Sequence, residues 1–253
     1  MKIALVQYNS VWNNKEKSIE SINALIENLE KKTECLIFPE MTLTGFTMDS
    51  KTHAEEIDGI GIKYFMDLAQ RKKIEVFAGI IEKDGDKYYN SLFHFNSWGL
   101  IQAVYRKIHP FSLGNENLHF SAGNEIVVST INKTKIGLSI CYDLRFPELY
   151  RLSAKEKVDV MINIANWPIK RIHHWKALLR ARAIENQFFM IGVNRVGDDP
   201  FHQYNGCSAI FNTMGDKLIL VENEEKIIYA ELNLAEVKTT RKKLPFLDDI
   251  KLI

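Results

Sequence analysis

Reactive side chains follow apolar, strand-like segments at four places in the sequence. Glu40 ends ECLIFPE, Lys107 ends LIQAVYRK and Cys141 ends KIGLSIC, while Asn166 and Trp167 end VDVMINIANW. The ends of strands in α/β sheets are where functional sites are assembled. Each residue alone has a plainer explanation, such as a polar strand terminus or a solvated charge. A carboxylate, an ammonium and a thiol in equivalent positions are nevertheless the parts of an acyl-transfer site.

Cys141 is the candidate nucleophile because of the residues around it. Ile136, Leu138 and Ile140 alternate with small residues, which indicates a buried strand, and Pro147 suits the first residue of a helix. An isolated buried cysteine is usually a core residue. A cysteine held between a strand and a helix can instead be activated by the positive end of the helix dipole.

Each part of such a site has a chemical role. At an ordinary thiol pKa near 8.5, only about 3% of a cysteine is thiolate at pH 7, so Cys141 needs a base. Glu40 can take the thiol proton, pass it to departing ammonia and then activate the water that cleaves a thioester. The Lys107 ammonium and the backbone N–H of Tyr142 can stabilise the negative oxygen, a contribution of about 3–4 kcal/mol per donor.

The composition limits the classes of partner. The chain has 253 residues, a formal net charge of +1 and 26% charged residues. This balance gives no reason to expect nucleic acid or an anionic membrane as a partner. No segment has the roughly 18 apolar residues of a membrane helix, and MKIALVQYNSVW is typical of a strand rather than of a signal peptide. We therefore expect a cytoplasmic protein.

The spacing of cysteine and histidine does not favour a metal site. The three cysteines, Cys35, Cys141 and Cys207, are far apart and form no CxxC pair. Neither a disulfide framework nor a zinc site fits that spacing. His173 and His174 are adjacent on a predicted helix, where their side chains point about 100° apart. We expect no bound metal.

Strands and helices alternate through most of the chain, which predicts a layered α/β sandwich with mixed sheets. The apolar period predicts an amphipathic helix over Lys15–Lys32, and turns at residues 84–86 and 97–99 predict a meander. The predicted strands are Ile3–Tyr8, Cys35–Phe38, Val76–Ile81, Tyr88–Phe95, Leu100–Tyr105, Ile136–Ile140, Val158–Ile164, Phe188–Val193, Ser208–Phe211, Lys217–Val221 and Lys226–Leu232, and the other helices are Ile62–Lys72, Pro147–Lys157 and His173–Asn186, followed by a short C-terminal helix.

Three segments resemble, in order, the signature regions of the nitrilase superfamily of carbon–nitrogen hydrolases. They are FPE at 38–40, YRKIH at 105–109 and CYDLRFPE at 141–148. The resemblance runs over nearly the whole chain, from MKIALVQ to about Leu232. It extends to ANWPIKRIHHWKALLRARAIENQ and NRVGDD, which are similar to one branch, the bacterial ω-amidases of the YafV type.

The resemblance implies an α-β-β-α sandwich of two mixed sheets, a homodimer paired across one helical layer, and no cofactor. It also implies that Glu40, Lys107 and Cys141 are catalytic. The family has a further glutamate between its lysine and cysteine that orients the lysine and the substrate. Glu116 matches that glutamate best, and Glu125 is the alternative. We expect one domain over residues 1–253, with 235–253 as an extension that can lie at the dimer interface.

Four residues are candidates for contacts with the substrate in an apolar pocket. Trp167 follows a strand that ends at the site, and Phe111 follows the lysine region and can cover it. Arg145 lies four residues after Cys141, and Arg171 lies shortly after Trp167. Each arginine can hold a substrate carboxylate with two hydrogen bonds or can brace the scaffold.

The sequence thus predicts an amidase that cleaves small ω-amides of dicarboxylic acids, such as 2-oxoglutaramate or 2-oxosuccinamate, to an acid and ammonia. The alternative within the superfamily is a deaminated-glutathione amidase, whose cysteine segment is also similar to CYDLRFPEL. Nitrile hydrolysis is less favoured, since this chain lacks a Cys-Trp-Glu segment. A papain-like enzyme needs a histidine such as His109 against Cys141. A non-catalytic binding relative is expected to lack one of the catalytic residues, and this chain has all of them.

Overall fold

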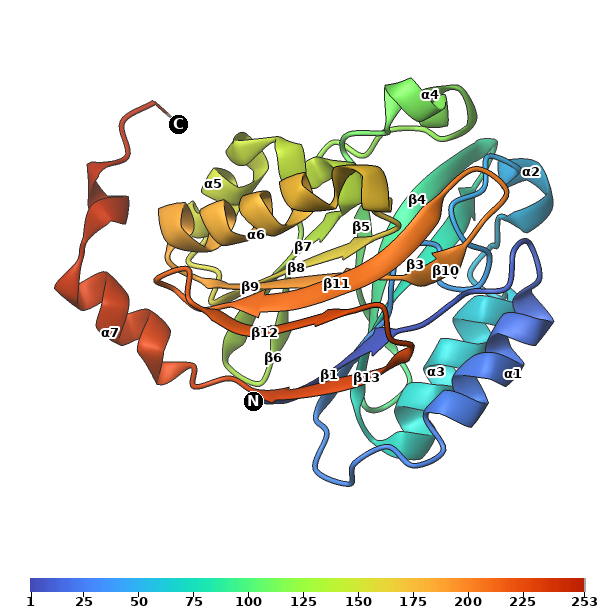
Figure 1. Ribbon diagram of the computed structural model, residues 1–253, viewed down its shortest axis with the longest axis horizontal. Coiled ribbons are helices and arrows are strands. Elements are labelled where there is room, and N and C mark those ends of the chain that lie inside the picture. The colour runs from blue at the N-terminus through green and yellow to red at the C-terminus, as the bar shows by residue number, and fades with distance from the viewer. Residues whose placement is uncertain (253) are drawn as a thin grey trace.

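Two mixed β-sheets, stacked face to face, form the centre of the protein (Figure 1). The computed structural model describes residues 1–252. The strand order is β13-β1-β2-β3-β4-β5 in one sheet and β10-β11-β9-β8-β7-β6 in the other, with β12 also paired to β11. The strands are β1 (Lys2–Gln7), β2 (Cys35–Ile37), β3 (Glu75–Asp84), β4 (Lys87–Phe95), β5 (Ile101–Arg106), β6 (Val128–Ile131), β7 (Thr134–Ile140), β8 (Val160–Ala165), β9 (Phe189–Asn194), β10 (Val196–Asp198), β11 (Gln203–Phe211), β12 (Lys217–Glu222) and β13 (Lys226–Glu231).

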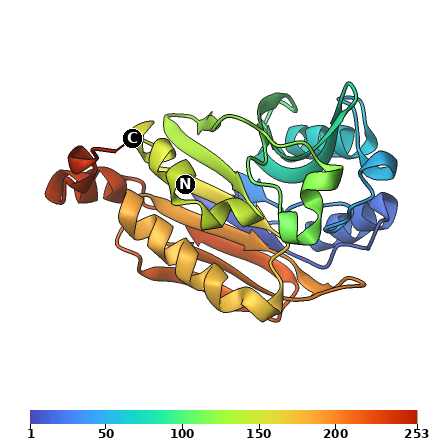
Figure 2. The ribbon, with the colours of Figure 1, turned by 90° about the horizontal axis from the view of Figure 1, so that it is seen from above.

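Helices cover the outer face of each sheet, so the predicted α-β-β-α sandwich is confirmed (Figures 1 and 2). On the first sheet lie α1 (Lys15–Leu25) and α3 (Ile60–Lys72), and on the second lie α5 (Pro147–Lys155) and α6 (Ile172–Asn186). Each sheet contains a parallel group, β1-β2-β3 or β7-β8-β9, with antiparallel strands at its sides. The carboxyl ends of parallel strands meet at one edge of a sheet, where a site can form.

The alternation of residues along β1 explains why this strand is buried on both faces. Ile3 and Leu5 belong to the apolar core that joins the two sheets, which also contains Leu138 of β7. Ala4 and Val6 point the other way, into the core beneath α1 and α3. A strand covered on both faces carries a nearly continuous apolar run, as IALV does here.

The predicted helix over Lys15–Lys32 is wrong at its C-terminal end. α1 ends at Leu25, and the next residues form turns in which the N–H of Leu29 donates to the carbonyl of Ile26. Beyond Ile26 the segment ENLEKK contains one apolar residue and an asparagine of low helix propensity. A helix there would bury little apolar surface, and burial provides most helical stability in proteins.

Short elements that the sequence patterns did not predict complete the fold. They are the strands β6 and β10 and the one-turn helices α2 (Ser50–His53) and α4 (Glu116–His119). Elements this short carry too little apolar periodicity to be recognised from sequence. Within residues 1–252, no helix is long and apolar enough to cross a membrane.

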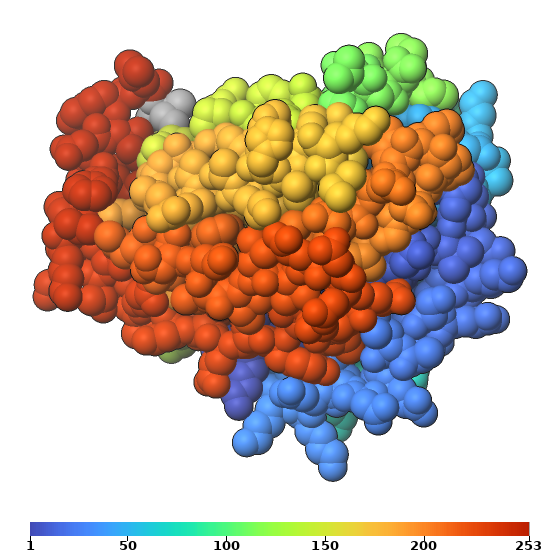
Figure 3. Space-filling model, in the orientation of Figure 1, coloured from blue at the N-terminus to red at the C-terminus, as the bar shows by residue number. Residues whose placement is uncertain are grey.

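The C-terminal residues extend from one end of the sandwich, at the left of Figures 1 and 3. The helix α7 (Ala235–Lys243) is attached by Arg241, which donates to the carbonyls of Val158 at 2.6 Å and Gln187 at 3.2 Å. Residue 253 of the predicted extension lies outside the described residues. The placement of residues 235–253 at a dimer interface stays a prediction.

Candidate active site

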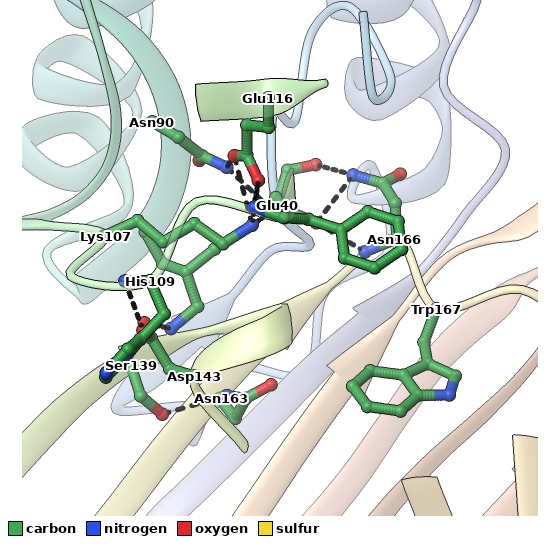
Figure 4. Close-up of polar contacts among 12 residues, drawn as sticks. Glu40, Asn90, Lys107, His109, Glu116, Ser139, Asp143, Asn163, Asn166 and Trp167 are labelled. Carbon is green, nitrogen blue, oxygen red and sulfur yellow. Dashed lines mark hydrogen bonds and ion pairs between the residues drawn. The ribbon is translucent and has the colours of Figure 1, made fainter. Parts of the chain in front are cut away.

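Three of the predicted residues meet in one buried cluster, where different strands end (Figure 4). Glu40 lies just beyond β2, Lys107 directly follows β5, and Glu116 begins α4. The Lys107 ammonium donates to Glu40 Oε1 at 2.9 Å and to Glu116 Oε2 at 2.8 Å. Each of the three residues is at most 1% exposed. Because burying an unpaired charge is costly, this ion pairing explains how the three charges tolerate burial.

The structure answers which glutamate accompanies the lysine. Glu116 accepts from Lys107 through both carboxylate oxygens, and its Oε2 also accepts the backbone N–H of Phe111 at 2.6 Å. Glu125 is exposed. Glu116 therefore occupies the place that the family resemblance gives to its second glutamate.

Two asparagines that the sequence analysis did not assign to the site hold the carboxylates. Asn90 Nδ2 lies 2.7 Å from Glu40 Oε1 and 2.7 Å from Glu116 Oε1. The backbone N–H of Asn166 donates to Glu40 Oε2 at 2.8 Å, and its side-chain amide donates to the Glu40 carbonyl at 2.8 Å. Asn166 directly follows β8, and the sequence indicated its place at a strand end without giving it a role. Asn90 lies inside a buried strand, where a lone asparagine is itself a signal.

The electrostatics of the cluster keep the lysine charged and the thiol neutral. Burial lowers the pKa of Lys107, but the Glu116 and Glu40 carboxylates together outweigh it and raise that pKa. Burial and the Glu40 charge raise the pKa of the Cys141 thiol well above its ordinary value, although Lys107 opposes them. Burial also raises the pKa of Glu116. A neutral thiol cannot attack a carbonyl efficiently, so Cys141 would need a neighbouring base to act as a nucleophile.

Cys141 occupies a sharp bend between β7 and a 3-10 turn over Cys141–Arg145. Its φ of +46° is in the left-handed region, which non-glycine residues rarely adopt. Such strained conformations persist where the surroundings fix them, and they cluster at functional sites. The predicted helix start is confirmed, because Pro147 is the first residue of α5.

The buried carboxylate of Asp143 fixes this bend and ties it to the lysine segment. It accepts the backbone N–H of Ile140 at 3.0 Å and the hydroxyl of Tyr105 at 2.7 Å. It also contacts the backbone N and ring Nδ1 of His109, at 3.0 and 2.8 Å. The His109 ring stacks on Phe146 with 3.8 Å between centroids. His109 thus serves as a brace here, and the papain-like alternative loses its candidate histidine.

Gly79 of β3 allows the turn that carries Glu40 to lie against the sheet. A Cβ atom at this position would lie 2.5 Å from the backbone N of Met41 and 2.8 Å from the Cα of Glu40. Those are backbone atoms, which cannot move aside as a flexible side chain can. The turn is also fixed by hydrogen bonds between Gly79 and Thr42, at 2.8 Å and 3.1 Å.

Replacing Gly79 by alanine is expected to displace Glu40 and to lower kcat for amide hydrolysis by at least about tenfold, because small displacements of catalytic groups are costly. The matched control is Gly85→Ala in the β3–β4 turn, where a Cβ meets nothing within 4 Å but φ is +57°. The control should lose about 1 kcal/mol of stability through backbone strain and keep its kcat. Steady-state kinetics and thermal unfolding of both variants provide the measurement. Equal kcat values in the two variants would show that the Glu40 turn tolerates displacement.

Cys141 lines a pocket with mainly aromatic walls, and all four predicted substrate-binding residues line it too. Phe111, Trp167, Arg145 and Arg171 are joined there by Phe46, Tyr142, Asn166, Pro168 and His202. The Arg145 guanidinium lies 4.7 Å from the Trp167 ring centroid, and that of Arg171 lies 5.6 Å from the Phe111 centroid. Phe46, which the sequence analysis did not name, also lies 5.5 Å from the Lys107 ammonium.

Within the part of the chain that the structure describes, the two pocket arginines lack a carboxylate partner. Among residues 1–252, neither Arg145 nor Arg171 forms an ion pair with an acidic side chain. Burial, and to a smaller extent the charge of Arg171, lowers the pKa of Arg145. A pocket with this surplus of positive charge favours an anionic ligand. Within the same residues, no group of three His, Cys, Asp or Glu side chains is placed to hold a metal ion.

Comparison with known proteins agrees with this fold. Residues 2–242 match the carbon-nitrogen hydrolase family, and the chain belongs to that family. It is a hydrolase that acts on C–N bonds. A 2-oxoglutaramate amidase of Bacillus subtilis is 32% identical over 98% of this chain and 97% of its own length. The omega-amidase YafV of Escherichia coli is 30% identical over 98% of this chain and 96% of its own length.

Two further matches complete the comparison. A deaminated glutathione amidase of Dictyostelium discoideum is 33% identical over 99% of this chain and 94% of its own length. Among solved structures, XC1258 of Xanthomonas campestris, described as a CN-hydrolase superfamily protein, superimposes with a TM-score of 0.95. The two sequences are 30% identical, and the superposition covers 100% of this chain and 98% of the XC1258 chain. The resemblance to the nitrilase superfamily, and to its YafV-like amidases, is confirmed.

Proposed function

We propose that this amidase hydrolyses the terminal amide of small dicarboxylic acid monoamides, such as 2-oxoglutaramate or 2-oxosuccinamate, through a thioester on Cys141. The observation that carries the proposal is the pair Arg145 and Arg171 in the pocket of the thiol, without acidic partners among residues 1–252. An ω-amide of this kind has a carbonyl for the thiol and, several atoms away, a carboxylate. Burying that carboxylate unpaired would cost several kcal/mol, and a guanidinium offers two parallel hydrogen bonds to it.

The first half of the reaction forms the thioester. Glu40 takes the proton of the Cys141 thiol as the sulfur bonds to the amide carbon and the carbonyl electron pair moves to oxygen. The Lys107 ammonium and the backbone N–H of Tyr142 donate to this oxyanion. The first N–H groups of a helical turn have no acceptor within the turn, so the N–H of Tyr142 suits this role. The C–N bond then breaks, and Glu40 returns the proton to the leaving ammonia.

The second half releases the acid. Water attacks the thioester carbonyl, Glu40 accepts a proton from that water, and the same donors hold the second oxyanion. When the C–S bond breaks, the proton returns to the sulfur and the dicarboxylic acid leaves. Glu116 takes no proton in this scheme. It fixes the position of the Lys107 ammonium, with which it shares two contacts of 2.8 and 3.1 Å.

Two alternatives make different predictions for a substrate panel. A deaminated-glutathione amidase should prefer an amide with a peptide extension, and one relative bears that name. A non-catalytic binding relative should release no ammonia from any amide. The test measures ammonia release from 2-oxoglutaramate, 2-oxosuccinamate, and neutral amides and nitriles of similar length. For deaminated glutathione, whose leaving group is a peptide amine, it measures release of that peptide. The highest kcat/KM with one of the first two supports the proposal.

Arg145→Met is expected to raise KM for 2-oxoglutaramate at least about tenfold while changing KM for a neutral amide of similar length by less than about twofold. In this variant the substrate carboxylate would enter an apolar pocket without a positively charged partner, whereas a neutral amide needs no such partner. Arg171→Met is the companion variant, with Arg145 the stronger candidate because its turn begins at the nucleophile. Values of kcat/KM for both substrates decide. Equal losses on the two substrates in both variants would mean that the arginines only brace the pocket.

The proposal also includes the homodimer and the cytoplasmic location predicted from the sequence. Both stay predictions. Light scattering coupled to gel filtration would measure the mass of the assembly, and a mass twice that of the chain would support the first of them.

A further inference from the structure

Asn90 lies between the two carboxylates of the active site. It belongs to β4, is 1% exposed, and its side chain points toward Glu40 and Glu116 (Figure 4). Its Nδ2 atom is 2.7 Å from an oxygen of each carboxylate. An amide nitrogen carries two N–H groups, so each carboxylate receives one of them. Among residues 1–252, no other uncharged side chain donates to both carboxylates.

The orientation of the Asn90 amide follows from these contacts. A reversed amide would place its carbonyl oxygen against two carboxylate oxygens, which would repel it. In the observed orientation Oδ1 is buried and has no hydrogen-bond partner among residues 1–252. An unsatisfied buried acceptor destabilises the fold. The two donor bonds to the carboxylates must therefore outweigh that cost.

The charges of the cluster explain why extra donors are needed there. The titratable groups that act electrostatically on this pair are Lys107, the Cys141 thiol and, more weakly and on Glu40 alone, Tyr204 of β11. One ammonium cannot neutralise two buried carboxylates that also repel each other. A neutral amide adds hydrogen bonds to the ionised forms without adding a charge that would compete with Lys107 for them.

We propose that Asn90 is a positioning residue that keeps Glu40 and Glu116 ionised side by side by donating one N–H to each carboxylate. The inference rests on the proposed role of Glu40 as the base. Without these N–H groups the carboxylate pair binds a proton more readily, since hydrogen bonds to the charged form are lost. A protonated Glu40 cannot accept the thiol proton. Asn90 thereby sets the lower pH limit of the reaction.

The test compares Asn90→Ala and Asn90→Ser with wild type and with Asn163→Ala as a matched control. Asn163 is also a fully buried asparagine whose Nδ2 donates twice, to Ser139 at 3.0 Å and to Tyr150 at 3.1 Å, and whose Oδ1 has no partner among residues 1–252. It does not contact the carboxylates. The measurements are the pH dependence of kcat/KM for 2-oxoglutaramate and of Cys141 alkylation by iodoacetamide.

In Asn90→Ala we expect the acid limb of the kcat/KM profile to move up by at least about one pH unit, because the pair protonates earlier as pH falls. Alkylation needs only thiolate, so it should become faster at a given pH, because a protonated Glu40 no longer raises the pKa of Cys141. Asn90→Ser, which keeps one donor, should move by less, and Asn163→Ala should keep the wild-type midpoints. Wild-type midpoints in the Asn90 variants, or an equal shift in the control, would overturn the inference. If Asn90→Ala does not fold, Asn90→Ser decides by the same criterion. If wild type hydrolyses no amide, the proposed function fails, and the alkylation profiles still decide the role of Asn90.

Discussion

Cys141→Ala is expected to lower ammonia release from 2-oxoglutaramate by at least about four orders of magnitude, since no other group can form the covalent intermediate. The variant should keep its fold, because the replaced thiol lines the pocket and Cys141 is half-buried rather than part of the closed core. Activity is measured under saturating substrate, and thermal unfolding verifies the fold. Mass spectrometry of rapidly quenched wild-type enzyme should show an acyl group on Cys141 that is absent from the variant.

The two other cysteines provide the controls for this prediction. Cys35 lies in β2 and is 1% exposed, and Cys207 lies in β11 and is fully buried. Both belong to the apolar core. Cys35→Ala and Cys207→Ala should lose about 1 kcal/mol of stability each through lost packing and should keep most of their activity. Ammonia release at the wild-type rate from Cys141→Ala would reject the thioester mechanism.

The sequence predicts the residues proposed to be catalytic better than it predicts the side chains that hold them in place. Glu40, Lys107 and Cys141 could be found because each follows a short apolar strand, and that placement is a local pattern. The partners of those residues depend on which strands lie side by side, which a single strand does not reveal. Asp143, for example, accepts from Tyr105, which is 38 residues away in the sequence.

Asn90 shows why the neighbours of a strand residue are hard to predict from the sequence. The predicted turn at residues 97–99 pairs the two strands as a hairpin, and in the observed register Ser91 faces Arg106 and Leu92 faces Tyr105. The same register places Asn90 beside Lys107, whose backbone N–H donates to the Asn90 carbonyl at 2.9 Å. An irregularity between His94 and Phe95 shifts the pairing near the turn by one residue. Because one residue of slip reverses the face of every side chain, the turn alone could not identify this neighbour.

The fold was predictable to the extent that burial creates periodicity. The parallel strands β2, β7 and β8 are largely apolar and mostly buried, and their existence was predicted correctly. The end of α1 was predicted wrongly, because apolar residues at Leu25, Ile26 and Leu29 continue the helical pattern past the point where the helix ends. Helix ends depend on local hydrogen bonds as well as on the apolar stripe.

Glu40→Gln is expected to separate the reactivity of the thiol from catalysis. Hydrolysis should fall by at least about a thousandfold, within the range of about a hundredfold to ten-thousandfold for a lost general base. The reason is that the Glu40 carboxylate no longer takes the thiol proton and gives it to ammonia. The thiol itself should become easier to ionise. Burial and then the Glu40 charge raise the pKa of Cys141, so removal of that charge lowers the pKa, and thiolate forms at a lower pH than it otherwise would.

The two measurements for this variant are kcat for 2-oxoglutaramate and the rate of alkylation by iodoacetamide at pH 7, and they should change in opposite directions. Glu125→Gln is the matched control, since Glu125 was the alternative glutamate and is exposed, and it should leave both quantities at their wild-type values. A slower alkylation together with lost hydrolysis would indicate a displaced Cys141 rather than a missing base. Hydrolysis at the wild-type rate in Glu40→Gln would require another base, and the cluster around Lys107 offers only Glu116 for that role.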